Sequence, residues 1–166
     1  MTNGGTDRPS EPSRKLSGSS SDLLKIRAAQ PEDYPDILDL LRELELDYPT
    51  RDLTRFHVGE LEGKILAIAE LKEYDDFCLL SCVGMREDRQ GSGLGRRLVS
   101  QVLRDVHKDV YLYTLVPGFF KKAGFVEATS PPAALPPRFI YGCSSCDPAF
   151  CRCLVRKSDE PEVSPV

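Results

Sequence analysis

A glycine-rich turn between an apolar segment and an amphipathic segment is the feature that most limits how this chain can fold. The apolar segment runs from Phe77 to Met85, and the turn reads Gln90-Gly91-Ser92-Gly93-Leu94-Gly95. Apolar residues then recur at intervals of three and four: Leu94, Leu98, Val99, Val102, Leu103 and Val106. This spacing predicts a helix over Leu94–Lys108, so the turn joins the end of a strand to the start of a helix.

The residues in and around the turn point to an anionic ligand. Glycines at alternate positions let the backbone approach a ligand closely, and the first N–H groups of a helix favour an anion. Four arginines flank the turn: Arg86, Arg89, Arg96 and Arg97. Arg96 and Arg97 fall in the first helical turn, where the helix dipole disfavours cations. A bound phosphate would remove this conflict; an ordinary glycine-rich turn is the alternative.

Two common phosphate-binding motifs do not fit. A P-loop needs Lys and then Ser or Thr after its last glycine, and the dinucleotide fingerprint needs glycine at position 96, where this chain has arginine. The turn does fit Gln/Arg-x-x-Gly-x-Gly/Ala and resembles the acetyl-CoA pyrophosphate loop of the GNAT family of N-acetyltransferases. A second stretch, Phe119–Phe125 (FFKKAGF), resembles the family's aromatic-x-x-x-Gly-Phe signature.

The rest of the chain predicts a mixed α/β sheet flanked by helices. We expect strands at 25–29, 56–61, 64–72, 77–85, 110–115 and from 125, and helices at 33–44, 94–108 and 117–123. This order is also that of the GNAT fold, whose mostly antiparallel central sheet has about six or seven strands. The expected domain covers 23–156, with a flexible tail before it, rich in Ser, Gly and Pro, and a second tail at 157–166.

Several single residues carry expectations of their own. One helical stripe is expected to be core: Tyr34, Ile37, Leu38, Leu41 and Leu44. Asp33 is the expected N-cap of that helix, and Gly84 marks a bulge or a close backbone approach. Cys78 and Cys82 are expected to be small buried residues on one face of their strand. His57 and His107 are interpreted as structural or solvent-facing, His107 at a helix C-terminus.

Composition argues against several classes of function. The 166 residues include 22 basic and 26 acidic side chains, a net charge of −4, so nucleic acid or an anionic membrane is not the expected partner. No apolar run approaches the ~20 residues of a membrane span, and no secretory signal is recognisable. Six cysteines without such a signal indicate reduced thiols and a cytoplasmic protein, which we expect to be a monomer or homodimer.

The resemblance implies direct acetyl transfer from acetyl-CoA, as co-substrate, to an amine. It places the cofactor against Val83, Met85, Arg86, Gln90, Gly91, Ser92, Gly93, Leu94, Gly95, Arg96, Phe119 and Phe120. The Met85 N–H, or that of a neighbour, would stabilise the oxyanion. Many members have a tyrosine acid where this chain has Phe120, and some have a glutamate base on the strand 77–85, which here contains no acid. Glu70 is the remaining candidate base, against a solvated strand residue or a water-relayed proton exit as alternatives.

The C-terminal part narrows the resemblance to the N-acetylglutamate synthase branch. The paired phenylalanines, Leu135-Pro136 and the cysteines Cys143, Cys146 and Cys151 are similar to short bacterial members, although the prolines near 131–137 and Cys153 depart from that pattern. An arsenic-resistance acetyltransferase-like protein is a related alternative. Glutamate would need cationic partners, for which four candidates exist: Arg27, Arg86, Lys121 and Arg138. A peptide acetyltransferase and a non-catalytic CoA-binding module are the competing hypotheses.

Four thiols in eleven positions raise the question of zinc. Zinc sites usually separate two ligand pairs by a longer loop, and Cys151-x-Cys153 is an awkward second pair. We therefore expect no metal there and interpret Cys143, Cys146, Cys151 and Cys153 as reduced thiols on the last strand and its approach.

Overall fold

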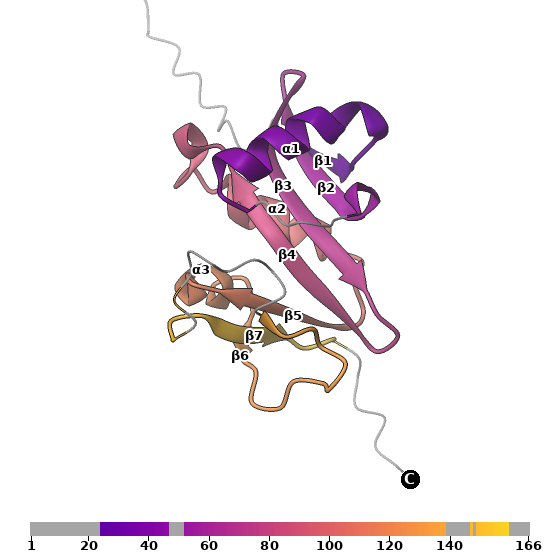
Figure 1. Cartoon of the computed structure of the whole chain (residues 1–166), viewed down its shortest axis with the longest axis vertical. Helices are drawn as coiled ribbons and strands as arrows, with labels where there is room; N and C mark the ends of the chain where they lie inside the picture. The colour runs from indigo at the N-terminus through magenta and orange to yellow at the C-terminus, as the bar shows by residue number, and fades with distance from the viewer. Residues whose placement is uncertain (1–23, 47–51, 139–146, 148, 160–166) are drawn as a thin grey trace, which may run out of the picture.

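The computed structural model describes residues 24–46, 52–138, 147 and 149–159, and its centre is a seven-stranded sheet (Figure 1). The strand order is β1-β2-β3-β4-β5-β7-β6. The strands are β1 (Lys25–Ala28), β2 (Phe56–Leu61), β3 (Lys64–Glu73), β4 (Phe77–Met85), β5 (Asp109–Thr114), β6 (Val126–Glu127) and β7 (Arg152–Arg156). All neighbouring pairs are antiparallel except β4 and β5, so the predicted mixed sheet is confirmed.

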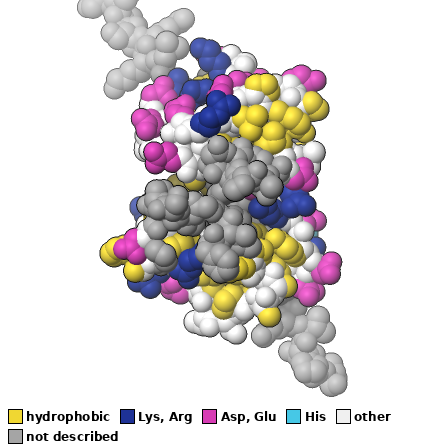
Figure 2. Space-filling model, viewed as in Figure 1, with side chains coloured by type: hydrophobic (Ala, Val, Ile, Leu, Met, Phe, Trp, Pro, Cys, Tyr) yellow, Lys and Arg dark blue, Asp and Glu magenta, His cyan; other side chains and the backbone are white. Residues whose placement is uncertain are grey.

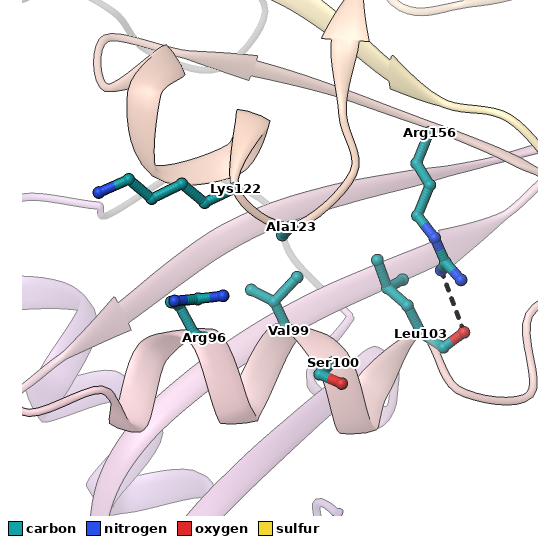
Figure 3. A pocket seen from close by; sticks show the side chains of 7 residues that line it. All are labelled: Arg96, Val99, Ser100, Leu103, Lys122, Ala123 and Arg156. Atoms are coloured by element: carbon teal, nitrogen blue, oxygen red, sulfur yellow. Dashed lines mark hydrogen bonds between the residues drawn. The ribbon is translucent and has the colours of Figure 1, made fainter.

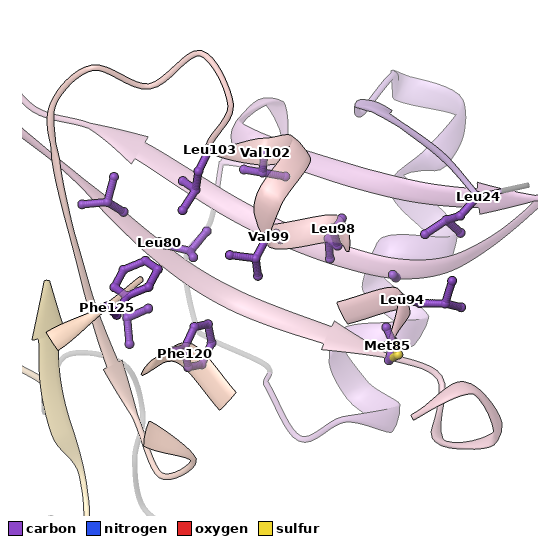
Figure 4. Packing of buried hydrophobic residues seen from close by; sticks show 14 of the residues in the cluster. Leu24, Leu80, Met85, Leu94, Leu98, Val99, Val102, Leu103, Phe120 and Phe125 are labelled. Carbon is purple, nitrogen blue, oxygen red and sulfur yellow. The ribbon is translucent and has the colours of Figure 1, made fainter. Parts of the chain in front are cut away.

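In the described part of the chain, three α-helices and three short 3-10 helices connect the strands. They are η2 (Pro31–Asp33), α1 (Tyr34–Glu43), η3 (Leu53–Arg55), η4 (Glu87–Arg89), α2 (Leu94–Val102) and α3 (Pro117–Lys121). α1 and α2 contribute to different apolar clusters, which shows that they pack on opposite faces of the sheet. The first cluster lies under α2 (Figure 4) and includes Leu98, Phe120 and Phe125. The second lies under α1, and a third surrounds Phe77, Leu79 and Leu135.

β4 and β5 run side by side only at their beginnings. Phe77–Leu79 pairs with Asp109–Tyr111, and beyond these three pairs the strands no longer pair with each other. The first strand of a parallel pair needs a crossover to reach the second, and α2 provides it here. The second halves of β4 and β5 therefore leave a gap that opens toward the glycine-rich turn, where β4 ends.

A β-bulge in β4 corrects one prediction. Ile68 pairs with Gly84 and Glu70 with Ser81, so two β4 residues oppose Ala69 alone, and Cys82 adopts a left-handed φ of 49°. An extra residue shifts every following side chain to the other face. Cys78 and Cys82 are both buried, as predicted, but they lie in the first and second clusters and not on one face.

Gly84 follows this bulge and permits a close approach. A Cβ at this position would overlap the Leu44 Cδ1 atom and lie 3.2 Å from Leu46 Cδ1. The chain segment after α1 therefore rests directly on the β4 backbone. Sequence reasoning offered a bulge or a close approach at Gly84; the structure has the bulge just before it and the approach at the glycine itself.

Several predicted boundaries and contacts need correction. α2 ends at Val102 and not at Lys108, because the chain turns after Leu103 to bring Val106 onto the first cluster and to enter β5. The exposed His107 is therefore not at a helix C-terminus. In α1, Leu40 is fully buried in the core and the predicted Leu38 is only half-buried.

The start of α1 also differs from its prediction. The Asp33 carboxylate makes no side-chain cap of α1; it accepts the Gln30 N–H at 2.8 Å and pairs with Arg27 at 2.6 Å. The hydrogen bond from Arg27 lowers the pKa of Asp33 below its usual value.

Residues 1–22 and the break expected at 47–50 lie outside the described residues. On the face shown in Figure 2, basic and acidic side chains are interspersed.

Candidate active site

The glycine-rich turn presents open backbone where α2 begins. Gly91 and Gly93 have φ values of +77° and +84°, a left-handed conformation that side chains other than glycine rarely adopt. A Cβ at either position would meet no described residue within 4 Å, so packing against the described chain does not explain the glycines. Gly93 is the N-cap of α2, and no side chain in the described part of the chain caps the helix, which leaves its first N–H groups available to an anion.

The turn is tied to the end of β4 and to α3. The Gln90 Nε2 group donates to Met85 O at 3.3 Å, and the Ser92 hydroxyl donates to Arg89 O within the turn. Gly95 lies in the first turn of α2 beside Phe119 of α3. These contacts hold the open N–H groups next to the gap between β4 and β5.

A cavity of about 640 Å³ joins the turn, the end of β4 and α3. It brings together nine predicted cofactor residues: Val83, Met85, Gln90, Gly91, Gly93, Gly95, Arg96, Phe119 and Phe120. Arg86, Ser92 and Leu94 do not line it; Arg86 pairs with Glu43 and Leu94 is buried in the first cluster.

Four lining residues escaped the sequence prediction: Gly84, Leu98, Val116 and Lys122. Lys122 lies within the FFKKAGF signature, so its positive charge could have identified it as a candidate for binding an anionic ligand. Leu98 and Val116 gave no such signal in the sequence, because apolar residues of a helix or near a strand end are ordinarily part of the core.

The backbone of β4 offers a hydrogen-bond donor to this cavity. The Arg86 N–H donates to Leu66 O of β3 at 2.9 Å. Because N–H groups of successive strand residues point to opposite edges, the Met85 N–H points away from β3, toward the gap. Such a donor, fixed by the sheet, is suited to stabilise an oxyanion without reorganisation.

The cations around the cavity differ in their partners. Arg86 pairs with Glu43 at 3.2 Å and Arg89 lies 3.9 Å from Asp88, so both have a nearby carboxylate. Within the described part of the chain, Arg96 and Lys122 have none. Both also line a second cavity of about 240 Å³ between α2 and the end of α3, together with Arg156 of β7 (Figure 3). Two adjoining cavities thus share two uncompensated positive charges.

Glu70 is a buried residue and not a solvated one. It is 0% exposed, and that alternative is therefore wrong. Its Oε2 atom accepts the Ser81 hydroxyl at 2.9 Å, and Lys72 Nζ lies 3.5 Å from Oε1. Glu70 does not line the cavity of 640 Å³, but Ser81, Cys82 and Val83 lead from it to the cavity wall along β4.

Comparison with known proteins places this geometry in a family. Residues 22–125, more than half of the chain, match the model of the acetyltransferase (GNAT) family. The chain belongs to the GNAT family. The glycine-rich turn, α2, β5, α3 and Phe125 all fall within the matched range, so the two motifs that predicted the family are part of the match.

Related GNAT proteins include amino-acid acetyltransferases. An amino-acid acetyltransferase from Ralstonia nicotianae is 31% identical over 127 residues, covering 67% of this chain and 28% of the relative. N-acetylglutamate synthase from Neisseria gonorrhoeae, solved with coenzyme A and N-acetyl-glutamate, has a TM-score of 0.63 at 22% identity, over 81% of this chain and 35% of that one. This chain therefore spans about a third of the length of these relatives.

A shorter protein shares the fold over nearly its whole length. Rv2747 from Mycobacterium tuberculosis, solved with CoA, has a TM-score of 0.60 at 20% identity, over 79% of this chain and 97% of that one. The GNAT fold predicted from the sequence is confirmed by these structures.

The remaining predicted residues lie apart from the cavity. Arg27 is held by Asp33 and Glu60, Lys121 by Glu127, and Arg138 donates to Cys151 O. His57 is half-buried, and its Nδ1 has no hydrogen-bond partner among the described residues; burial lowers its pKa.

Of the four C-terminal cysteines, Cys151 and Cys153 are half-buried, whereas Cys143 and Cys146 lie outside the described residues. Burial raises the pKa of the Cys153 thiol, which keeps it protonated near neutral pH. None of the helices in the described ranges is long and apolar enough to cross a membrane.

Proposed function

We propose that this chain transfers the acetyl group of acetyl-CoA to the α-amino group of a small amino acid, with glutamate as the first acceptor to test. The observation that carries the proposal is the cavity of about 640 Å³, because it joins open helix N–H groups, two uncompensated cations and the end of a parted strand. A ligand with a diphosphate and a long neutral arm matches all three features.

In this proposal the turn binds the diphosphate and the gap receives the thioester arm. The N–H groups from Gly91 to Gly95 and the charge of Arg96 face the phosphates. The arm enters along β4 from the turn, past Met85 toward Val83, and the N–H of Met85 or of a neighbour stabilises the carbonyl oxygen as it gains charge. Phe119 and Phe120 form the apolar wall, with their rings 4.9 Å apart edge to face.

Glutamate is favoured by the proteins that this chain resembles and by the charges near the end of β4. The Ralstonia relative is an amino-acid acetyltransferase, and the Neisseria structure contains N-acetyl-glutamate. Among the four cations proposed for the substrate carboxylates, Arg27 already holds two carboxylates and is the least available. Arg86 directly follows Met85 and has one exposed partner, Glu43, so it is the best placed of the four.

A single assay tests the proposal. The full chain is supplied with acetyl-CoA and a panel of amino acids, amines and peptides; release of the CoA thiol is followed, and products are identified by mass. Acetylation of glutamate or another amino acid supports the proposal, and acetylation of peptides alone replaces it with peptide acetylation. Tight CoA binding in calorimetry without turnover of any amine would instead identify a non-catalytic CoA-binding domain.

A further inference from the structure

A buried carboxylate lies where β4 bulges, and the cofactor geometry does not account for it. Glu70 is 0% exposed, a rare state for glutamate unless it is paired. Its Oε1 atom accepts no hydrogen bond from any residue in the described ranges, although Lys72 Nζ lies 3.5 Å away. Replacing such a buried ion pair by apolar side chains is often neutral or stabilising, so packing alone does not explain the glutamate.

The other oxygen of Glu70 is directed at the bulge. Oε2 accepts the Ser81 hydroxyl at 2.9 Å and lies 3.6 Å from Cys82 Sγ. Ser81 is half-buried, whereas Glu70 is fully buried. The Ser81 hydroxyl therefore joins the buried carboxylate to a partly accessible residue, which gives a proton a route to Glu70.

Ser81 is also well placed along β4. It comes two residues after Leu79, the last β4 residue paired with β5, and two residues before Val83, which lines the cavity. Leu80 packs into the cluster under α2, so Ser81 points to the opposite face of the sheet. An amine that approaches from that face meets Ser81 beside the inner end of the gap.

We propose that Ser81 and Glu70 form a proton relay for the acceptor amine, an inference that rests on the proposed acetyl transfer. The substrate ammonium gives a proton to Ser81 Oγ while the Ser81 hydroxyl proton moves to Glu70 Oε2. The neutral amine then forms the C–N bond to the thioester carbon, and the C–S bond breaks. The second nitrogen proton passes to the departing thiolate, and Glu70 returns its proton to solvent through Ser81.

The relay replaces groups that this chain lacks. β4 contains no acidic residue, and Phe120 cannot donate a proton. The bulge places the Ser81 hydroxyl against the carboxylate of the neighbouring strand, so β3 supplies the base. Lys72 Nζ faces the other carboxylate oxygen of Glu70 at 3.5 Å, and of the two relay residues only Ser81 touches the substrate.

The test compares Glu70→Gln, Ser81→Ala and Ser81→Thr with wild type in the acetyl-CoA assay on the best acceptor. Glu73→Gln is the matched control, because Glu73 is exposed at the end of the same strand. General base catalysis contributes roughly 10²–10⁴-fold, so we expect kcat of Glu70→Gln to fall by about 10²-fold or more. Ser81→Ala should lose about 10-fold and Ser81→Thr should regain most of it, with the KM for acetyl-CoA unchanged in all variants.

The pH dependence separates a relay from a structural role. Without the relay the acceptor must bind as the neutral amine, so the rate of Glu70→Gln should rise by about tenfold per pH unit below the pKa of that amine, more steeply than in wild type, at unchanged CoA affinity and thermal midpoint. If wild type is active and Glu70→Gln and Ser81→Ala keep its rate and pH profile, the relay is wrong while acetyl transfer stands. If wild type binds CoA but acetylates no amine, the proposed function and the relay are both wrong.

Discussion

Gly95 lies against the ring of Phe119, where a Cβ at position 95 would be 3.1 Å from the ring Cζ atom. The same Cβ would lie 3.5 Å from Met85 Cε. The first turn of α2, the end of β4 and α3 therefore meet at a position without a side chain. This contact sets the width of the cavity at the point where the turn joins the gap.

We expect Gly95→Ala to weaken CoA binding about tenfold, or ~1.4 kcal/mol, because Phe119 must shift into the cavity by a few tenths of an ångström. Isothermal calorimetry with CoA measures the loss. Gly118→Ala is the control, since a Cβ there meets nothing within 4 Å, and its CoA affinity should equal that of wild type. Equal affinities for all three proteins would show that Phe119 does not contact the ligand.

The cavity shared by Arg96, Lys122 and Arg156 predicts a preference for a third phosphate. CoA carries a ribose 3′-phosphate that dephospho-CoA lacks, and we expect wild type to bind CoA roughly tenfold more tightly, since a hydrogen bond to a charged group contributes about 1.5–3 kcal/mol. Lys122→Met and Arg156→Met should reduce this ratio toward one.

The control for this experiment is Arg104→Met, which removes a positive charge that lies outside both cavities and pairs with Asp105. It should keep the wild-type ratio in the same calorimetric titrations. If wild type binds the two ligands equally, the second cavity does not take the 3′-phosphate.

His57 predicts a pH dependence of stability. Burial lowers its pKa in the folded state from the ordinary value of 6.5, so the unfolded chain takes up more protons in the window below that value. The stabilisation is therefore complete above about pH 6.5 and is lost as the pH falls toward the folded-state pKa. His57→Gln should flatten the urea-unfolding free energy across this window.

The second histidine of the chain provides the control for that measurement. His107 is exposed, so His107→Gln makes the same chemical change at a position outside the core and serves as the matched variant. A His57→Gln protein with the wild-type slope would mean that another group titrates in this window. Asp33 contributes a separate loss at lower pH: because its pKa is lowered in the fold, its stabilisation is complete above about pH 3.8 and is lost as the pH falls toward the folded-state pKa.

Tyr113 of β5 holds the proline-rich segment near 131–137 against the sheet through a hydrogen bond. Its hydroxyl donates to Pro136 O at 2.8 Å, and Leu135 is buried against the same strand pair. Tyr113→Phe should cost about 1 kcal/mol of unfolding free energy, because it removes this bond and leaves a carbonyl without its donor. Tyr74→Phe, which keeps the ring stacked 4.6 Å from Phe77, should be close to neutral in the same denaturant titration.

The fold and the cavity at the glycine-rich turn were predictable because they depend on local patterns. Period-two and period-three-to-four apolar spacing located the strands and helices, and the glycines at 91 and 93 require the backbone conformation that the turn adopts. Features that depend on how neighbouring strands pair could not be predicted from the sequence. The bulge at Cys82 depends on the pairing with β3, and it moved Cys82 to the other face of the sheet. The burial of Glu70 has the same origin, since its partner Ser81 is eleven residues away in the sequence.

The three residue pairs that join β4 to β5 have a consequence for how the domain responds to its ligand. Beyond them, the facing edges of the two strands carry peptide groups with no ladder between them. A cofactor arm that contains amide groups would fill this space as an inserted strand, hydrogen-bonded on both sides. A bound cofactor would then connect the two halves of the sheet through hydrogen bonds, and the stability of the folded domain would rise with cofactor concentration.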